Sequence, residues 1–456
     1  MMRTILSVGV ILLASVCASA QQWLTVIPNR AVYSLAVNPL NPRTVLAGNM
    51  ARTLFRSSDG GATWEESAIQ SAGGSSLITC LLIHPADTSI VFAGGVGFDG
   101  IDRSTDNGVT WSNVLRDPVG SRMEFVGESI QAHPTNPDTM YALRNAPGIV
   151  YRSTDRGATW DSLSTIPTTV GTDRFEAIAV APDSTNIILV GGRVAFMYRS
   201  VDGGKTFVRG PRLTGHPDSE ISLLRWSPSR PGTVYATVQY QLAQNVNNAG
   251  LYQSTDWGLT WKQIAHNNVS LYALEVFPGL TATDPDVIFV GGNQPPLSPA
   301  QIKGDSLAFK SIDGGVTWQE ITGVPWTENE LMEVNTNVWA FAKVRHQDVD
   351  AMMLASEAGV FLSTTLASVA TGSAAASASG LSVRVQGDGS IILNKASAEG
   401  AASVHFLSVD GSLIATHDVT MHGGSVRLSP HHLPQGAYIV VLRDPSSTSS
   451  ALMIRY

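Results

Sequence analysis

The feature that most constrains this chain is an eight-residue pattern, Ser-x-Asp-x-Gly-x-Thr-Trp, that occurs six times. The copies occupy residues 57–64, 104–111, 153–160, 200–207, 254–261 and 311–318, and the fourth ends in Phe instead of Trp. Successive copies lie roughly 47 to 57 residues apart, close to the period of a four-stranded propeller blade. The spacing therefore predicts an all-β chain built as a β-propeller.

Each copy has the residues of a structural turn between two strands. Asp accepts backbone N–H bonds two residues on, Ser adds a second side-chain bond, and Gly supplies a positive φ. The Thr begins the next strand, and the aromatic residue covers apolar surface at the blade's edge. The turn residues are Ser57, Asp59, Gly61, Trp64, Ser104, Asp106, Gly108, Trp111, Ser153, Asp155, Gly157, Trp160, Ser200, Asp202, Gly204, Phe207, Ser254, Asp256, Gly258, Trp261, Ser311, Asp313, Gly315 and Trp318. We expect these aspartates to be structural, and no metal site or cofactor is predicted.

This motif resembles the Asp-box, or BNR repeat, of sialidase-like β-propellers. The resemblance implies ligand-binding and catalytic groups on the face opposite the boxes, around the central channel. Sialidases also need an Arg-Ile-Pro segment, which this chain lacks, since VIPNR (26–30) has another order. The chain further resembles two groups of non-enzymatic seven-bladed propellers, the photosystem II assembly factor type and the sortilin type. Those bind peptides or proteins on the loop face.

A second repeated pattern fixes the number of blades. An apolar strand, a Pro-containing turn and another apolar strand recur from 33–48 to 272–292, and a seventh, degenerate copy covers 338–356. That seventh unit has no fourth strand of its own after residue 365. We therefore expect the N-terminal segment 21–27 to complete it and so to remove the free edges of the ring. Seven blades over 21–366 is the prediction, with a six-bladed ring as the alternative.

Strand alternation then places the loops. If the strands of a blade are A to D, the A–B turns and the Asp-boxes share one face, and the B–C and D–A loops share the other. We call these the box face and the loop face.

Composition narrows the class of partner. The formal charge is −8 over 456 residues, which argues against nucleic acid, because phosphate binding needs a basic surface. Cys80 lies in an alternating apolar run, and we expect it to be buried and inert.

The N-terminus has the organisation of a secretory signal peptide. Arg3 precedes a short apolar stretch, 5–16, and the small residues of 18–20 form a cleavage site. A lipoprotein attached through Cys17 is the alternative. The apolar stretch is too short to span a bilayer. The expected location is therefore extracellular or on the cell surface, without a transmembrane segment after cleavage.

The C-terminal part is predicted to be a separate domain. A Ser/Ala-rich linker, 367–380, precedes about seven short strands in 381–456, which indicate a small Ig-like β-sandwich. The stretches 404–419 and 428–442, with a Leu-x-x-Gly-x-Tyr-apolar pattern, resemble the sorting domain of the type IX secretion system. That resemblance implies export across the outer membrane, with the secretion machinery as a partner. An ordinary adhesive Ig-like module remains the alternative.

Aligning the A strands on their Pro turns brings a set of residues to the channel mouth on the loop face. Tyr33, Glu128, Glu176 and Tyr272 share one register position, six residues before the Pro. Further candidates end the B strands or lie in adjacent loops. The candidate binding residues are Tyr33, Arg122, Glu124, Glu128, Arg144, Arg174, Glu176, Arg193 and Tyr272. They predict either a polar pocket that binds a ligand or inter-blade ion pairs that line a solvated channel.

The sequence thus favours a secreted propeller that binds a protein, peptide or glycan through its loop face, and favours binding over catalysis. The alternative is a glycoside hydrolase of sialidase or xyloglucanase type. Xyloglucanase-type propellers place two aspartates across a cleft between two tandem propellers, and this chain has room for one propeller. No catalytic residues are assigned.

Overall fold

The computed structural model describes residues 23–364, and strands between 382 and 455. Outside the described residues lie 1–22, 71–75, 117–127, 168–173, 216–218, 241–248, 267–268, 280–283, 294–306, 325–336, 348, 365–381, 386–390, 395–399, 409–412, 423–424, 429–435, 445–446 and 456. The predicted signal peptide (1–20), the linker (367–380), Arg122 and Glu124 are among these. Every regular element in the described part is a β-strand.

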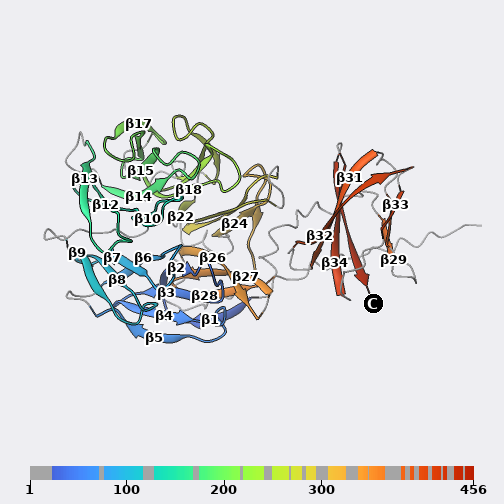
Figure 1. Cartoon of the computed structure of the whole chain (residues 1–456), viewed down its shortest axis with the longest axis horizontal. Coiled ribbons are helices and arrows are strands. Elements are labelled where there is room, and N and C mark those ends of the chain that lie inside the picture. Colours follow the sequence, from blue (N-terminus) through green and yellow to red (C-terminus); the bar gives the residue numbers. More distant parts are fainter. Residues whose placement is uncertain are drawn as a thin grey trace, which may run out of the picture.

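Seven four-stranded antiparallel sheets lie between Leu24 and Ser363 in the described residues. Figure 1 shows them as a ring, with the first strand innermost in each sheet that is formed by consecutive strands, so the chain is an all-β propeller. Six of the sheets are formed by consecutive strands. Blade 1 contains β2 (Val32–Val37), β3 (Val45–Asn49), β4 (Thr53–Ser57) and β5 (Glu65–Ala68). Blade 2 contains β6 (Leu77–Ile83), β7 (Val91–Val96), β8 (Gly100–Ser104) and β9 (Ser112–Arg116).

The next four blades repeat this order. Blade 3 contains β10 (Ile130–Ala132), β11 (Met140–Arg144), β12 (Ile149–Ser153) and β13 (Asp161–Thr165). Blade 4 contains β14 (Phe175–Val180), β15 (Ile188–Gly192), β16 (Phe196–Ser200) and β17 (Val208–Arg212). Blade 5 contains β18 (Ser219–Trp226), β19 (Val234–Tyr240), β20 (Gly250–Ser254) and β21 (Lys262–Ala265). Blade 6 contains β22 (Ser270–Phe277), β23 (Val287–Asn293), β24 (Ala308–Ser311) and β25 (Gln319–Glu320).

Blade 7 is built from both ends of the propeller sequence. It contains β26 (Val338–His346), β27 (Val349–Ser356) and β28 (Gly359–Ser363), and its outer strand is β1 (Leu24–Pro28). β1 runs antiparallel to β28, with Leu24 opposite Leu362 and Pro28 opposite Gly359. The predicted closure by the N-terminal strand is confirmed. Trp23 differs from the box tryptophans, because its indole N–H donates to the Thr322 carbonyl beyond blade 6 at 3.0 Å.

The Asp-box turns have the predicted hydrogen bonds. In the second box, Asp106 accepts bonds from the Ser104 hydroxyl, the Thr110 hydroxyl and the Thr110 backbone N–H at 2.7, 2.6 and 2.8 Å. Gly108 has a φ of 83° and donates its N–H to Ser104 Oγ. The Thr110 hydroxyl and backbone bonds, with the bond from Ser104, lower the pKa of Asp106 to about 2. These carboxylates are therefore saturated by their own turn.

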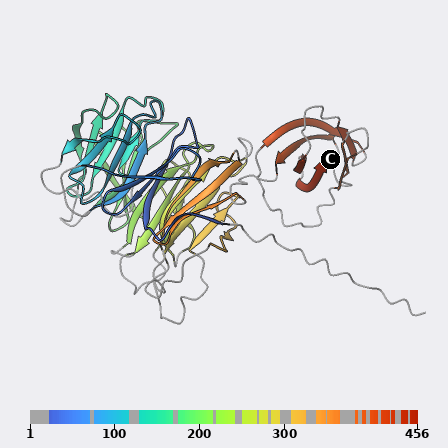
Figure 2. The same cartoon turned by 90° about the horizontal axis from the view of Figure 1, so that it is seen from below.

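Backbone bonds fix the face on which the boxes lie. The residue after the box Asp donates its N–H to a carbonyl of the A–B turn of the same blade, as in Asn107 to Ser89 and Gly203 to Asn186. Boxes and A–B turns therefore share one face, as the strand alternation predicted. Figure 2 shows the ring from another side, where the strands cross the propeller from one face to the other.

The C-terminal strands form two sheets, one of three strands in the order β29-β30-β33 and one of four in the order β32-β31-β34-β35. Buried side chains from both sheets, including Ile391, Leu393, Phe406 and Leu442, share one core. The strands are β29 (Ser382–Val385), β30 (Ile391–Asn394), β31 (Gly400–Ser408), β32 (Leu413–Met421), β33 (Ser425–Leu428), β34 (Gly436–Asp444) and β35 (Ser447–Arg455).

Replacing Asp106 by Ala removes the acceptor of four turn bonds, including one from the Val109 N–H. We expect it to lower the free energy of unfolding by about 1–2 kcal/mol. The folded pKa lies below the usual 3.8, so this contribution is present above about pH 4 and is lost as the pH falls toward about 2. Urea unfolding at pH 7 and at acid pH measures both effects. Asp161→Ala, an exposed carboxylate on β13, is the control, and an equal loss in both variants would contradict the structural role.

Candidate functional site

A ring of β-bulges marks the loop-face end of the channel. In six of the seven innermost strands the pairing with the B strand shifts register at an equivalent position. One residue of the A strand there has no partner on the B strand, which is a β-bulge. The bulge residues are Tyr33, Thr79, Glu176, Ser222, Tyr272 and Trp339. Bulges re-aim side chains and are frequent beside active sites. The position that the Pro register selected is therefore a structural feature of the channel mouth.

Glycines at the ends of the B strands leave room for these bulges. A Cβ on Gly192 would lie 2.0 Å from the Arg174 carbonyl oxygen, and one on Gly292 would lie 2.0 Å from the Ser270 carbonyl oxygen. Only glycine allows the backbone to come this close. The Gly pairs that end several B strands therefore allow the A-strand bulges to form at the channel mouth.

Three of the bulge residues form an aromatic strip across blades 6, 7 and 1. The ring centroids of Tyr272 and Trp339 are 4.9 Å apart, and those of Trp339 and Tyr33 are 5.5 Å apart. Glu357, in the turn between β27 and β28, lies beside the strip. Burial, followed by the charge of Glu357, raises the pKa of Tyr33. Burial also raises the pKa of Glu357, against the effect of hydrogen bonds from Asn337.

Two buried glutamates lie at the same mouth. Glu176 and Glu220 are 4% and 1% exposed, and the Gln239 amide donates to one oxygen of each, at 3.2 and 3.1 Å. Those two oxygens are thus at most about 6 Å apart. Arg193 Nε lies 3.4 Å from the other oxygen of Glu220. Burial first, and then the charges of Glu357, Glu176 and Glu220, raise the pKa of Tyr272, so the pair lies within electrostatic reach of the aromatic strip.

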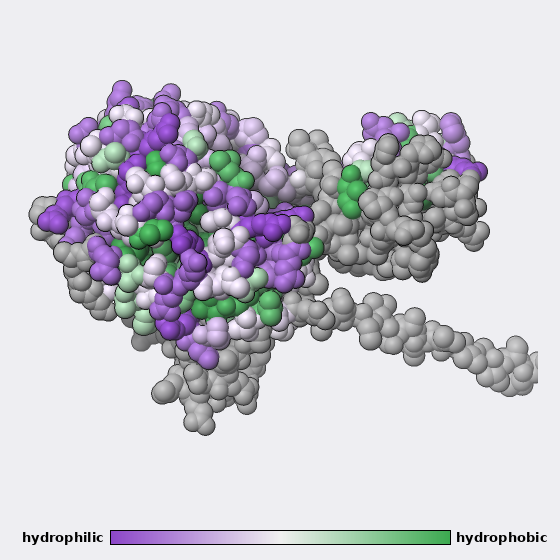
Figure 3. Space-filling view, turned by 60° about the horizontal axis from the view of Figure 1, so that its bottom comes forward, coloured by the Kyte–Doolittle hydropathy of each residue, from purple (hydrophilic) through white to green (hydrophobic). Residues whose placement is uncertain are grey.

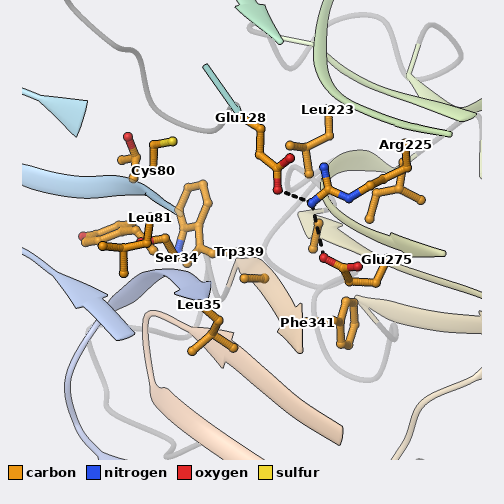
Figure 4. A pocket seen from close by; sticks show the side chains of 15 residues that line it. Ser34, Leu35, Cys80, Leu81, Glu128, Leu223, Arg225, Glu275, Trp339 and Phe341 are labelled. Atoms are coloured by element: carbon orange, nitrogen blue, oxygen red, sulfur yellow. Dashed lines mark hydrogen bonds and ion pairs between the residues drawn. The ribbon is translucent and has the colours of Figure 1, made fainter. Parts of the chain in front are cut away.

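Deeper in the channel, a second charge cluster joins three blades. One Nη atom of Arg225 on β18 donates to Glu128, which precedes β10, and to Glu275 on β22 at 3.2 Å. Figure 4 shows Arg225 between the two carboxylates, with Trp339 and Leu223 nearby. The cavity around them is about 50 Å³, enough for a few water molecules but not for a sugar or peptide. This cluster joins the inner strands and is not a ligand site.

The candidate residues separate into two groups. Glu176, Arg193, Tyr33 and Tyr272 lie at the mouth, whereas the Glu128 carboxylate accepts a bond from Arg225 deeper in the channel. Arg144 ends β11, and the Arg174 carbonyl accepts a bond from the Arg193 N–H at 2.8 Å.

Sequence reasoning missed several residues of the mouth and of the deeper Arg225 cluster. Glu220, Arg225, Gln239, Glu275, Trp339 and Glu357 were not selected. Arg225 and Glu275 share a register position three residues before the Pro, and that shared position is a signal that could have found them. Trp339 is the bulge residue of the seventh blade, but its strand has no Pro turn from which to count.

The surface favours a polar ligand. Figure 3 shows hydrophilic residues over most of the visible propeller surface, with small, separate hydrophobic spots. Large exposed apolar side chains in the described part, such as Leu40, Val208 and Val316, stand in different blades. Broad apolar patches typical of protein docking do not appear on this view of the described residues.

The described residues offer neither a metal-binding cluster nor a membrane-spanning helix. The described residues contain no group of three or more His, Cys, Asp or Glu side chains that could hold a metal ion. They also include no helix long and apolar enough to cross a membrane. Cys80 is buried, and burial raises its pKa to about 11.

Comparison with known protein sequences finds a xyloglucanase among the relatives of this chain. No protein-family model matches the chain. It is 25% identical over 380 residues to a xyloglucanase, Xgh74A, of Acetivibrio thermocellus, covering 72% of this chain and 40% of the relative. The chain thus spans well under two thirds of the length of that relative.

Solved structures agree on the fold. The GH74 xyloglucanase of Xanthomonas campestris has a TM-score of 0.56 and 18% identity, over 75% of this chain and 53% of that one. An ancestral GH74 enzyme has a TM-score of 0.57 and 14% identity, over 96% and 64%. These likenesses show a β-propeller. The sequence relative fits the glycoside hydrolase alternative better than a role in binding alone.

Replacing Arg225 by Met leaves two partly buried carboxylates without their cation, so we expect a loss of about 2–3 kcal/mol of unfolding free energy at pH 7. The loss should shrink when Glu275→Gln is added, and also as acid pH protonates the carboxyls. Urea unfolding of the single and double variants measures this. Arg116→Met, at the exposed end of β9, is the control. Unchanged stability in Arg225→Met would refute the structural role of the cluster.

Proposed function

We propose that this chain is a glycoside hydrolase that acts on an extracellular glycan at its loop-face mouth. The observation that carries the proposal is the pair Glu176 and Glu220, bridged by Gln239 within about 6 Å and close to the aromatic strip. Retaining glycosidases place two carboxyl groups about 5–5.5 Å apart, and inverting enzymes about 6.5–9.5 Å. The pair is consistent with retention.

The neighbours of each carboxyl suggest its role. The Arg193 guanidinium, 3.4 Å from Glu220, stabilises a negative charge there, which suits a nucleophile that attacks the anomeric carbon. Glu176 then protonates the glycosidic oxygen as the bond to the leaving sugar breaks, and later takes a proton from the water that hydrolyses the glycosyl–enzyme ester. The Gln239 amide holds both carboxyls in place.

The aromatic strip supports a sugar as the ligand. The rings of Tyr272, Trp339 and Tyr33 are neighbours; Trp339 is 7% exposed, and the two tyrosines are partly exposed. The apolar faces of sugar rings pack well on aromatic surfaces. The relative that shares 72% of this chain is a xyloglucanase, so xyloglucan is the first substrate to test. This chain spans 40% of the length of that relative. Xyloglucan as the substrate of this chain is therefore part of what we propose.

We expect Glu176→Gln and Glu220→Gln each to reduce turnover of xyloglucan, or of another β-glucan, about a thousandfold. Reducing-sugar release measures the rate, and NMR of the first product measures the anomer, which should be retained. Glu65→Gln, 76% exposed on β5, is the control.

Three outcomes would contradict the proposal. Tight glycan binding without turnover by the wild-type protein would favour the binding-only role, and an inverted product would refute the assigned pair. Binding of a peptide or protein, with no affinity for glycans, would refute a glycan-directed function altogether.

The C-terminal domain is proposed to be a type IX secretion sorting domain that delivers the propeller to the cell exterior. The support is the sequence resemblance in 404–419 and 428–442, together with the compact two-sheet core. The partner would be the secretion machinery, and the location extracellular or at the cell surface.

Deleting 381–456 should leave the protein in the periplasm with its propeller folded, because the propeller has its own closed core. Fractionation of cells that express the full and truncated chains measures this. Normal delivery of the truncated chain to the surface would contradict the sorting role.

A further inference from the structure

A pocket of about 510 Å³ lies where the ring is closed, between blades 7 and 1. Its walls come from the link between β1 and β2, from the turn between β3 and β4, and from the turn between β27 and β28. These are D–A and B–C loops, so the pocket opens on the loop face. Its volume lies within the range of small-molecule sites, about 300–1,000 Å³.

The lining suits a neutral, hydroxyl-rich ligand. Asn29 and Asn49 provide amides, Glu357 a carboxylate, Arg30 a guanidinium, and Tyr33 an aromatic ring. The charges are balanced, because the lining contains one cation and one carboxylate, and Arg30 lies 3.6 Å from Glu66. Such a mixture of donors, acceptors and one flat ring matches the hydroxyls and the apolar face of a sugar unit better than an ionic group.

The pocket is pre-formed by fixed backbone. Asn29, Ala51 and Arg52 have φ of 54°, 54° and 59°, a left-handed conformation that non-glycine residues rarely adopt. Arg52 is buried, with its Nε donating to the Ser76 hydroxyl at 3.0 Å and its guanidinium 4.7 Å from the Phe98 ring centroid. Strain of this kind collects at ligand sites, where the surrounding structure holds it.

The carboxylate of the pocket is also fixed. The Asn337 backbone N–H and side-chain amide donate to the two oxygens of Glu357 at 2.5 Å each. The Asn29 N–H donates to the Ala358 carbonyl in the same turn at 3.0 Å. The end of β1 and the turn between β27 and β28 form the seam where the ring closes, and this bond holds them together at the pocket wall.

Tyr33 connects this pocket to the mouth. It lines the pocket and also the channel cavity. Its ring lies next to that of Trp339 at an interplanar angle of 54°, and Trp339 lies next to Tyr272 at 35°. The aromatic strip therefore runs from the neighbourhood of Glu176 and Glu220 to the seam. A glycan chain lying along the three rings would bring one of its units into the pocket.

We propose that the pocket between blades 7 and 1 is a saccharide subsite that holds one neutral sugar unit of a glycan bound along Tyr272, Trp339 and Tyr33. The proposal rests on the glycan-directed function proposed above. Tyr33 acts in it as a binding residue, and Met50, which is 47% exposed at the rim, borders the space that the sugar fills.

The test is to measure binding by calorimetric titration of the full chain with xyloglucan oligosaccharides. Every variant also carries Glu176→Gln, so that the ligand is not consumed. Met50→Trp fills the pocket, and we expect it to weaken binding at least tenfold. Tyr33→Ala should weaken binding similarly, whereas Tyr33→Phe, which keeps the ring, should lose less than threefold. Val208→Trp, at a 71% exposed position on β17, is the control for adding an indole, and thermal unfolding verifies each fold.

The outcomes separate the two proposals. If Glu176→Gln binds the oligosaccharides and Met50→Trp binds them equally well, the subsite is refuted while the glycan-directed function stands. If Glu176→Gln binds none of them, and the wild-type chain neither binds nor cleaves them, both are refuted. Weaker binding in Val208→Trp equal to that in Met50→Trp would also count against the subsite.

Discussion

The antiparallel pairing of β1 with β28 is the constraint on which the rest of this propeller depends. It joins residues more than three hundred positions apart, completes blade 7 and leaves the ring without an open edge. The same pairing places Asn29 and Arg30 directly against the turn that carries Glu357. The seam is thus both the closure of the fold and one wall of the loop-face pocket.

Much of the fold could be predicted from the sequence because its signals are local. The Asp-box turn needs its own Ser, Asp, Gly and Thr, and its spacing marks each blade. The Pro register also found three residues of the mouth, Tyr33, Glu176 and Tyr272, since a position counted within one strand does not depend on other blades. The sequence could not show the partner of Glu128, because Arg225 lies 97 residues away on the other side of the channel.

The mouth itself depends on backbone geometry that composition does not reveal. Tyr33, Glu176, Tyr272 and Trp339 meet there because each is the extra residue of a bulge. Glu220 and Gln239 come from a blade whose register residue, Ser222, gave no hint of a carboxyl pair. Ion pairs between blades and polar residues at the mouth both occur, but at different depths in the channel. Arg225 and its two carboxylates fill the inner channel, whereas the bridged glutamates and the aromatic strip lie at the loop-face end.

The central claim is that a glycan lies on the loop face along the aromatic strip, and a crystal structure of Glu176→Gln with a xyloglucan oligosaccharide tests it most directly. We predict sugar rings stacked on Tyr272, Trp339 and Tyr33, with a glycosidic bond beside Glu220. Ordered sugar on the box face, or a loop face that stays empty at saturating oligosaccharide, would contradict the account.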